Sequence, residues 1–107
     1  MDDQAFRIQS DAALDDLFRA LTASGDFPFE ADLNSGALTV EFDDPPGKFV
    51  VSPNAPVRQI WVSALTTSFK LDWVEARGAF VLSATGRTLR ELMGDVISQQ
   101  LGEPIEL

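Results

Sequence analysis

Apolar and polar positions follow a helical period at the beginning of the chain. Between residues 4 and 23 the apolar residues recur every three or four positions, at Phe6, Ala13, Leu14, Leu17, Phe18 and Leu21. This spacing gathers them on one stripe and predicts an amphipathic helix, which Gly25 is expected to end. One side of the helix should therefore pack against a core, while Asp11, Asp15 and Asp16 point away from it.

A second helical pattern lies near the end of the chain. Thr88 and Glu91 have the spacing of a capping box, in which the hydroxyl and the carboxylate each accept a hydrogen bond from a backbone amide. The apolar residues that follow share one face: Leu89, Leu92, Met93, Val96, Ile97 and Leu101. Gly102 is expected to end this helix, and the apolar residues Ile105 and Leu107 can then fold back over the core.

Between the two helical segments the hydrophobic period changes to two residues, which is typical of half-buried strands. Six short strands are predicted, at about 27–33, 38–43, 48–52, 57–64, 68–73 and 79–84. Because the turns between them are short, they favour an antiparallel sheet. Two single-faced helices can cover one face of such a sheet. The sequence therefore predicts an α+β two-layer sandwich, in the order helix, six strands, helix, as a single domain over residues 1–107.

The predicted fourth strand has residues of opposite character on its two faces. Its aliphatic residues Ile60, Val62 and Ala64 belong to the helix-covered face, which places Gln59 and Trp61 on the open face. Further polar residues are expected to share that open face: Glu30, Asp32, Glu41, Lys70 and Asp72. A tryptophan beside an amide on a polar sheet is a candidate protein-binding hot spot. The alternative is that neighbouring strands half cover the indole and it only packs.

Acidic residues concentrate in the first part of the chain. The first 44 residues hold eleven acidic and two basic residues, whereas the remainder holds six of each, so this segment carries the whole net charge of −9. A field of this sign repels nucleic acid and anionic lipid, and it attracts cations or a basic protein surface. The alternative is that the charge only keeps the protein in solution.

Missing residue types exclude several kinds of chemistry. The chain has no cysteine and no histidine, which removes thiolate metal sites and the commonest general base. It also lacks a glycine-rich phosphate loop and a nucleophile elbow, so we expect no enzyme. Only oxygen ligands remain, and they select hard cations or oxygen-bound iron at weak surface sites. No apolar run is long enough to cross a membrane, and a soluble cytoplasmic protein is expected.

Four local motifs in the correct order resemble the frataxin family, which includes the bacterial CyaY proteins. The family's Asn-x-Gly-x-Leu-Thr hairpin is matched by residues 34–39. Its Pro-x-x-Gln-Ile-Trp-Leu-Ser strand, the most specific of the four, is matched by residues 56–63. Residues 72–92 follow the family's route into its second helix, and residues 98–105 resemble the ending of CyaY proteins.

The resemblance implies a frataxin-like fold and a function that the residues alone do not name. Frataxins bind ferrous and ferric iron weakly through an acidic ridge on the first helix and first strand. They also bind the cysteine desulfurase–scaffold complex, formed by IscS and IscU in bacteria, and modulate iron–sulfur cluster assembly. The implied protein is a monomeric iron donor or regulator of that assembly, with neither nucleic acid nor membrane as a partner.

The resemblance also implies which residues carry these roles. The iron-binding ridge corresponds to Asp11, Asp15, Asp16, Asp26, Glu30 and Asp32, with Asp11 as an outlying member. The partner-binding surface corresponds to Asn54, Gln59, Trp61 and Lys70, of which Gln59 and Trp61 match most directly. The family's ridge is densest in the second half of the first helix, but residues 17–24 contain no acid here. The ridge is therefore thinned.

Two functions are consistent with these features, and a third, ferroxidase activity, is unsupported. The leading hypothesis is an iron-binding accessory protein, in which the same carboxylates hold hydrated Fe²⁺ and steer the protein towards a basic patch on the desulfurase. The alternative is an iron-independent acidic interaction module that regulates the desulfurase, with binding that weakens steeply with salt. A ferroxidase needs a defined redox site, and nothing in the sequence indicates where one would lie.

Overall fold

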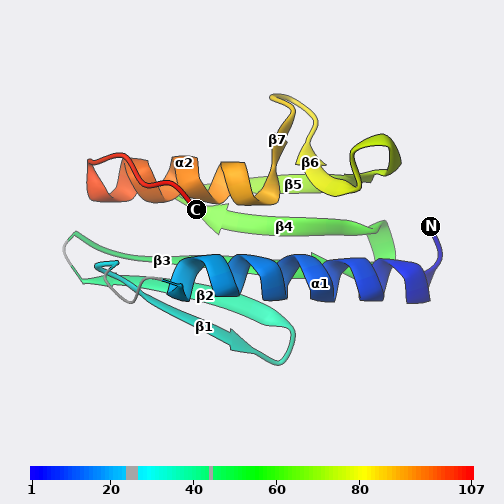
Figure 1. Ribbon diagram of the computed structural model, residues 1–107, viewed down its shortest axis with the longest axis horizontal. Helices are drawn as coiled ribbons and strands as arrows, with labels where there is room; N and C mark the ends of the chain where they lie inside the picture. The colour runs from blue at the N-terminus through cyan, green and yellow to red at the C-terminus, as the bar shows by residue number, and fades with distance from the viewer. Residues whose placement is uncertain (24–26, 44) are drawn as a thin grey trace.

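The computed structural model describes residues 1–23, 27–43 and 45–107, which form two helices and one antiparallel sheet (Figure 1). The helices are α1 (Asp3–Thr22) and α2 (Leu89–Leu101). The strands are β1 (Glu30–Asn34), β2 (Ala37–Asp43), β3 (Pro46–Asn54), β4 (Gln59–Ala64), β5 (Thr67–Val74), β6 (Ala79–Leu82) and β7 (Arg87–Thr88). Single 3-10 turns, η1 (Ala55–Val57) and η2 (Glu75–Arg77), join β3 to β4 and β5 to β6.

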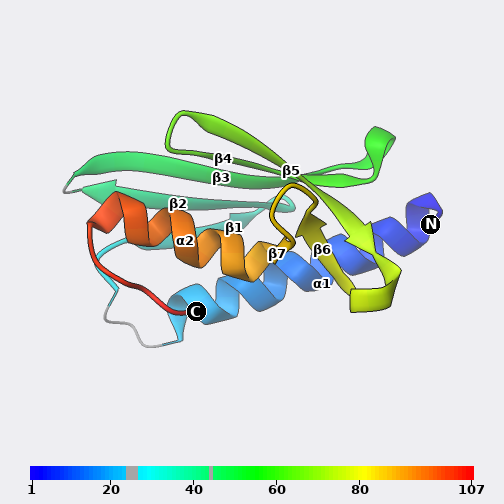
Figure 2. The same ribbon diagram turned by 90° about the horizontal axis from the view of Figure 1, so that it is seen from above.

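The strands lie in the sheet in their order along the chain, from β1 at one edge to β7 at the other, and every neighbouring pair is antiparallel. Both helices lie on the same face of this sheet, as the view from above shows (Figure 2). The other face has no helix over it within the described part of the chain. The predicted α+β two-layer sandwich, with both helices on one face, is therefore confirmed.

The core forms where the helix stripes meet the covered face of the sheet. Residues at the predicted positions are buried there: Phe6, Leu14, Leu17 and Leu21 of α1, Ile60, Val62 and Ala64 of β4, and Leu92, Met93, Val96 and Ile97 of α2. Phe80 is also buried, and Trp73 packs edge-on against it with ring centroids 5.2 Å apart. Because the apolar residues of each strand fill this face, their alternating neighbours are left on the other one.

The ends of the helices have the capping groups that the sequence contains. Asp2 accepts from the backbone N–H of Ala5 at 2.7 Å at the start of α1. The predicted capping box at the start of α2 is present, with both the Thr88 and the Glu91 side chains accepting from backbone amides. Gly102 ends α2 at φ 71°, a left-handed conformation that glycine adopts without steric cost. The predicted stop at Gly25 lies outside the described residues.

The first strand begins at Glu30 and not at residue 27, where it was predicted to start. The sheet differs from the prediction in two further respects. It has seven strands rather than six, because Arg87 and Thr88 pair with Leu82 and Val81 as a short β7. The sequence indicated only a helix start there, since Thr88 serves both as the last strand residue and as the helix cap. In addition, β3 continues through Pro53, where a break was expected. Pro53 is paired by register with Ile60, and its missing N–H does not end the strand.

The C-terminal tail folds back along α2, as the apolar residues at its end predicted. Ile105 and Leu107 are half-buried against the core. The hydroxyl of Ser98 holds the tail by accepting from the backbone N–H of Ile105 at 2.9 Å, and it donates to the carbonyl of Gly94 at 2.7 Å. Within the described residues, neither helix is long and apolar enough to cross a membrane.

Candidate functional site

The open face of the sheet carries Trp61, as the alternation along the fourth strand predicted. On β4 the burial alternates, so that Ile60 and Val62 are buried while Trp61 is 37% exposed. The strand register places Trp61 directly opposite Lys70 on β5, and Gln59 opposite Asp72. These four side chains therefore form two adjacent cross-strand pairs on one surface.

Polar contacts join the four side chains of this group, which we call the Trp61 square (Gln59, Trp61, Lys70 and Asp72). The indole N–H of Trp61 donates to the Gln59 side-chain oxygen at 2.9 Å. The Gln59 amide nitrogen donates to the Asp72 carboxylate at 3.0 Å. The Lys70 ammonium lies 5.0 Å from the centroid of the Trp61 ring, within the range of a cation–π contact. The indole is thus exposed and also fixed in orientation.

Asn54, the fourth residue of the predicted partner surface, borders the Trp61 square. It is half-buried at the end of β3 and lies opposite Gln59 in the β3–β4 register. The structure therefore brings all four predicted residues, Asn54, Gln59, Trp61 and Lys70, onto neighbouring strands. Sequence reasoning placed Asp72 on the same face but missed its contact with Gln59, because register across a hairpin cannot be read from one strand alone.

A group of acidic residues occupies the same open face at the β1 edge. Glu30 and Asp32 are exposed on β1, and Glu30 lies directly opposite Glu41 of β2. Like charges at directly opposed positions destabilise a strand pair. Lys48 of β3 is the residue opposite Glu41 on its other side. The open face thus has an acidic end at β1 and β2, and an aromatic centre at β4 and β5.

The acidic residues of α1 differ from those of β1 because two of them are paired with arginines. Asp15 forms an ion pair with Arg19 one turn along the helix, with 3.0 Å between nitrogen and oxygen. Asp16 lies 3.6 Å from Arg90 of α2. Asp11 is exposed and lines a groove beside the turn that follows β3. Asp26, also predicted for iron, lies outside the described residues.

The arrangement of these carboxylates limits the kind of metal site they can form. Among residues 1–23, 27–43 and 45–107, no group of three or more acidic side chains is close enough together to hold a metal ion. A hard cation bound by one or two carboxylates completes its coordination with water, which gives weak binding. The described acids therefore fit a loosely held, largely hydrated cation and not a closed site.

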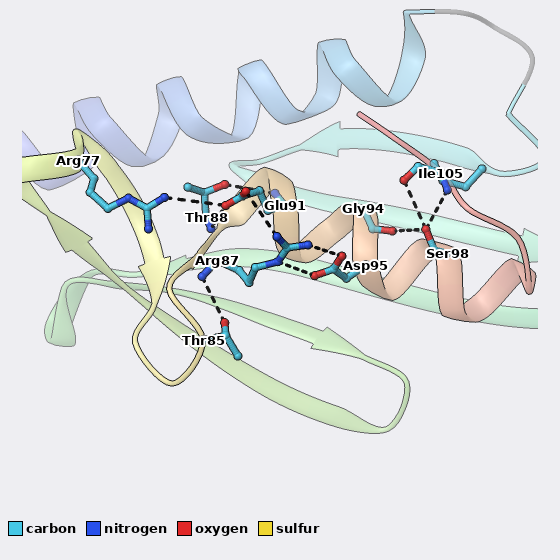
Figure 3. A network of polar contacts seen from close by, with 9 residues as sticks. All are labelled: Arg77, Thr85, Arg87, Thr88, Glu91, Gly94, Asp95, Ser98 and Ile105. Carbon is cyan, nitrogen blue, oxygen red and sulfur yellow. Dashed lines mark hydrogen bonds and ion pairs between the residues drawn. The ribbon is translucent and has the colours of Figure 1, made fainter.

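Two arginines near the start of α2, Arg77 and Arg87, are occupied by structural contacts (Figure 3). Arg87 binds both oxygens of Asp95, at 2.9 and 2.7 Å, and this raises the pKa of Arg87. Arg77 donates to the carbonyl of Gly86. Glu91 accepts from the Thr88 backbone N–H at 2.9 Å, which holds the pKa of that carboxyl below its ordinary value. These contacts fix the β6–β7 turn against the helix start.

Comparison with protein-family models matches residues 1–103 to the model of a frataxin-like domain. The chain belongs to the frataxin-like family. The resemblance carried by the four motifs is thereby confirmed, and the match spans nearly the whole chain.

The curated relatives of this frataxin-like chain are bacterial proteins named iron–sulfur cluster assembly protein CyaY. The one from Stutzerimonas stutzeri is 33% identical over 104 residues, which cover 91% of this chain and 94% of the relative. The one from Azotobacter vinelandii is 32% identical over 81 residues, covering 76% and 73%. The one from Thioalkalivibrio sulfidiphilus is 29% identical over 111 residues and covers both chains completely.

Solved frataxin structures have the same fold. A frataxin from Psychromonas ingrahamii matches with a TM-score of 0.85 at 22% identity, covering 99% of this chain and 97% of that one. Yeast frataxin matches with a TM-score of 0.65 at 21% identity, covering 92% and 82%. The order of helices and strands described above is therefore the frataxin fold.

Proposed function

We propose that this protein is a non-enzymatic accessory protein of iron–sulfur cluster assembly, and that it docks on the cysteine desulfurase–scaffold complex through the open face of its sheet. The observation that carries the proposal is Trp61, an exposed indole whose orientation is fixed by Gln59 and Lys70. Family membership and the names of the curated relatives support the pathway.

The Trp61 square has the properties of an interface hot spot. Tryptophan contributes a large contact area at low conformational cost, and it is enriched among residues whose truncation weakens binding most. The contacts from Gln59 and Lys70 reduce the freedom that the indole would lose on binding. Binding at Trp61 therefore needs little rearrangement of the free protein.

The acidic end of the open face favours a partner with a basic surface. Glu30, Asp32 and Glu41 are exposed on the same side of the sheet as Trp61. Opposite charge on the partner would raise the association rate and fix the orientation of the encounter, and both effects weaken with salt. We expect the desulfurase to meet this end with lysine and arginine side chains.

We further propose that the acidic residues bind iron weakly, as cargo for the assembly reaction. Within the described part of the chain, Glu30 and Asp32 form no ion pair, so their charge is available to a cation. Asp15 and Asp16 already face arginines and contribute less. Asp11 and Asp26 complete the proposed set.

The second candidate is an iron-independent module that regulates the desulfurase through the same face. It is favoured by one observation, that no three acidic side chains of the described residues gather into a metal-binding group. In this version the acidic residues only attract and orient the basic surface of the partner, and they bind no iron. The two candidates share the docking surface and differ in whether Fe²⁺ changes the interaction.

A binding titration with purified cysteine desulfurase, with and without the scaffold protein, tests the docking proposal. Wild type should bind, and Trp61→Ala should weaken the affinity by at least about thirtyfold, as expected for a hot spot. Ile8→Ala is the matched control. Ile8 is also an exposed apolar side chain, 58% exposed, but it lies on α1 in the helix layer. Equal affinities for wild type and Trp61→Ala would contradict the proposal.

Repeating the titration anaerobically with Fe²⁺, at about 50 and about 200 mM salt, separates the two candidates. An affinity or stoichiometry that changes with Fe²⁺ supports the iron-binding version. Binding that falls with salt but ignores Fe²⁺ supports the iron-independent module.

A further inference from the structure

Asp72 and Trp61 are linked through a third residue, and none of the described hydrogen bonds joins them directly. Asp72 lies on β5, diagonal to Trp61 across the β4–β5 pair, and both of its neighbours in the Trp61 square lie between them. The link runs through Gln59, whose side chain contacts Asp72 at one end and Trp61 at the other. The hydrogen-bonded link from Asp72 to Trp61 therefore runs through the position of Gln59.

The chemistry of the two ends selects one orientation of the Gln59 amide. An ionised carboxylate only accepts hydrogen bonds and an indole N–H only donates them. The amide must therefore turn its nitrogen towards Asp72 and its oxygen towards Trp61, and these are the contacts at 3.0 and 2.9 Å. Without an acceptor oxygen at position 72, a half-turn of the amide is no longer opposed from that side. It would then present the amide nitrogen, a donor, to the indole donor.

The same contacts decide which part of Trp61 a partner can use. The indole N–H is already satisfied by Gln59, and the Lys70 ammonium lies over the ring at 5.0 Å. What remains exposed to a partner is the carbon surface of the ring. The interaction at this point is therefore apolar and depends on how the ring is presented, since no hydrogen bond from the indole is available.

We propose that Asp72 is a positioning residue for partner binding: through the Gln59 amide it holds the Trp61 indole so that its ring carbons, and not its N–H, face the partner. The proposal rests on the docking function proposed above. It adds a residue that forms none of the described hydrogen bonds with the indole and that, by this argument, does not meet the partner's apolar surface.

The orientation can be measured in the free protein by the side-chain indole N–H signals in a proton–nitrogen NMR spectrum. The chain has two tryptophans, and the Trp73 indole donates to Glu75 at 2.6 Å, away from the Trp61 square. Asp72→Ala should shift the Trp61 signal and speed its exchange with solvent, while the Trp73 signal stays in place. Asp72→Asn retains an acceptor oxygen and should leave both signals close to wild type.

The affinity for cysteine desulfurase is measured with the same variants. Asp72→Ala should weaken binding by about three- to tenfold, the effect of losing one orienting hydrogen bond. Asp72→Asn should stay within about twofold. Both substitutions remove the same negative charge. A difference in affinity between the two variants therefore measures the effect of the hydrogen-bond acceptor at position 72, and not the effect of the charge. Trp61→Phe should retain most of the affinity that Trp61→Ala loses, since the N–H is not offered to the partner.

Each result has a definite meaning. An unchanged Trp61 signal in Asp72→Ala overturns the positioning role, whatever the affinity. Equal losses for Asp72→Ala and Asp72→Asn overturn it as well, because they would trace the effect to charge. Equal losses for Trp61→Phe and Trp61→Ala would show that the N–H is used. If wild type fails to bind desulfurase, the docking function is wrong, and the NMR comparison still decides whether Asp72 orients the indole.

Discussion

Asp16 of α1 lies 3.6 Å from Arg90 of α2, so that an acidic residue predicted to hold iron is paired with a cation from the other helix. Its neighbour Asp15 is paired with Arg19 at 3.0 Å. Both arginines reduce the negative potential that a metal ion would meet along the helix. The acids of β1 are left as the more electronegative part of the predicted ridge.

This pairing predicts an order of iron binding. In an anaerobic Fe²⁺ titration followed by backbone amide NMR, the signals of Glu30 and Asp32 should broaden at lower iron than that of Asp16. Arg90→Gln frees the Asp16 carboxylate, and we expect about a twofold gain in its response to Fe²⁺. Arg7→Gln is the control, because Arg7 is also on the helix layer and forms no ion pair among the described residues. If Arg90→Gln and Arg7→Gln raised the response of Asp16 to Fe²⁺ equally, the gain would come from the change in net charge, and the Asp16–Arg90 ion pair would not explain it.

A second prediction concerns the hairpin turn between β4 and β5. Leu65 and Thr66 connect the paired residues Ala64 and Thr67, and both have positive φ, 52° and 61°. Two-residue turns of this kind prefer glycine at the second position, and a β-branched residue there is strained. Thr66→Gly should therefore stabilise the protein by about 1 kcal/mol, which raises Tm by about 4 °C. Thermal unfolding measures the change.

The β1–β2 turn provides the reciprocal control. It has the same length, between Asn34 and Ala37, and already has glycine at the second position, with φ 79° at Gly36. Gly36→Thr should destabilise the protein by a similar amount. A turn-strain explanation would be wrong if Thr66→Gly left Tm unchanged while Gly36→Thr lowered it.

A third prediction concerns the C-terminal tail. Ser98→Ala removes both the acceptor of the Ile105 N–H and the donor to Gly94, the contacts seen in Figure 3. We expect a loss of about 1 kcal/mol in the free energy of unfolding and faster hydrogen exchange at the Ile105 amide. Ser68→Ala is the matched control, because Ser68 is exposed and takes part in none of the described side-chain hydrogen bonds. Unchanged exchange at Ile105 in Ser98→Ala would show that the apolar contacts alone hold the tail.

A fourth prediction concerns acid stability at the start of α2. The Thr88 N–H lowers the pKa of Glu91 in the folded protein below its ordinary value of 4.5, so the ionised carboxylate stabilises the fold. This contribution is complete at neutral pH and is lost as the pH falls below about 4.5 through the lowered pKa. Glu91→Gln should therefore flatten the fall of the urea midpoint over that range. Parallel pH profiles of wild type and Glu91→Gln would contradict this role.

Much of the fold is readable from local pattern. The stripe from Phe6 to Leu21 and the capping box at Thr88 predict helices because their spacing matches 3.6 residues per turn and the needs of a helix start. The alternation along β4 likewise places Trp61 on the open face. Each of these features depends on residues only a few positions apart, and such local patterns can be recognised in a single sequence. The short β7 was missed because its two residues have no periodicity of their own.

The sequence by itself determined the two-layer architecture, the burial of each stripe, the placement of Trp61 on the open face and the location of the net charge, since all of these follow from composition and period. Only the tertiary structure decided which charged and polar groups meet. Arg90 reaches Asp16, and Asp72 reaches Gln59, across 74 and 13 positions of sequence. Such contacts depend on helix packing and strand register, which bring distant side chains within a few ångströms, and neither can be read from the residues on one element.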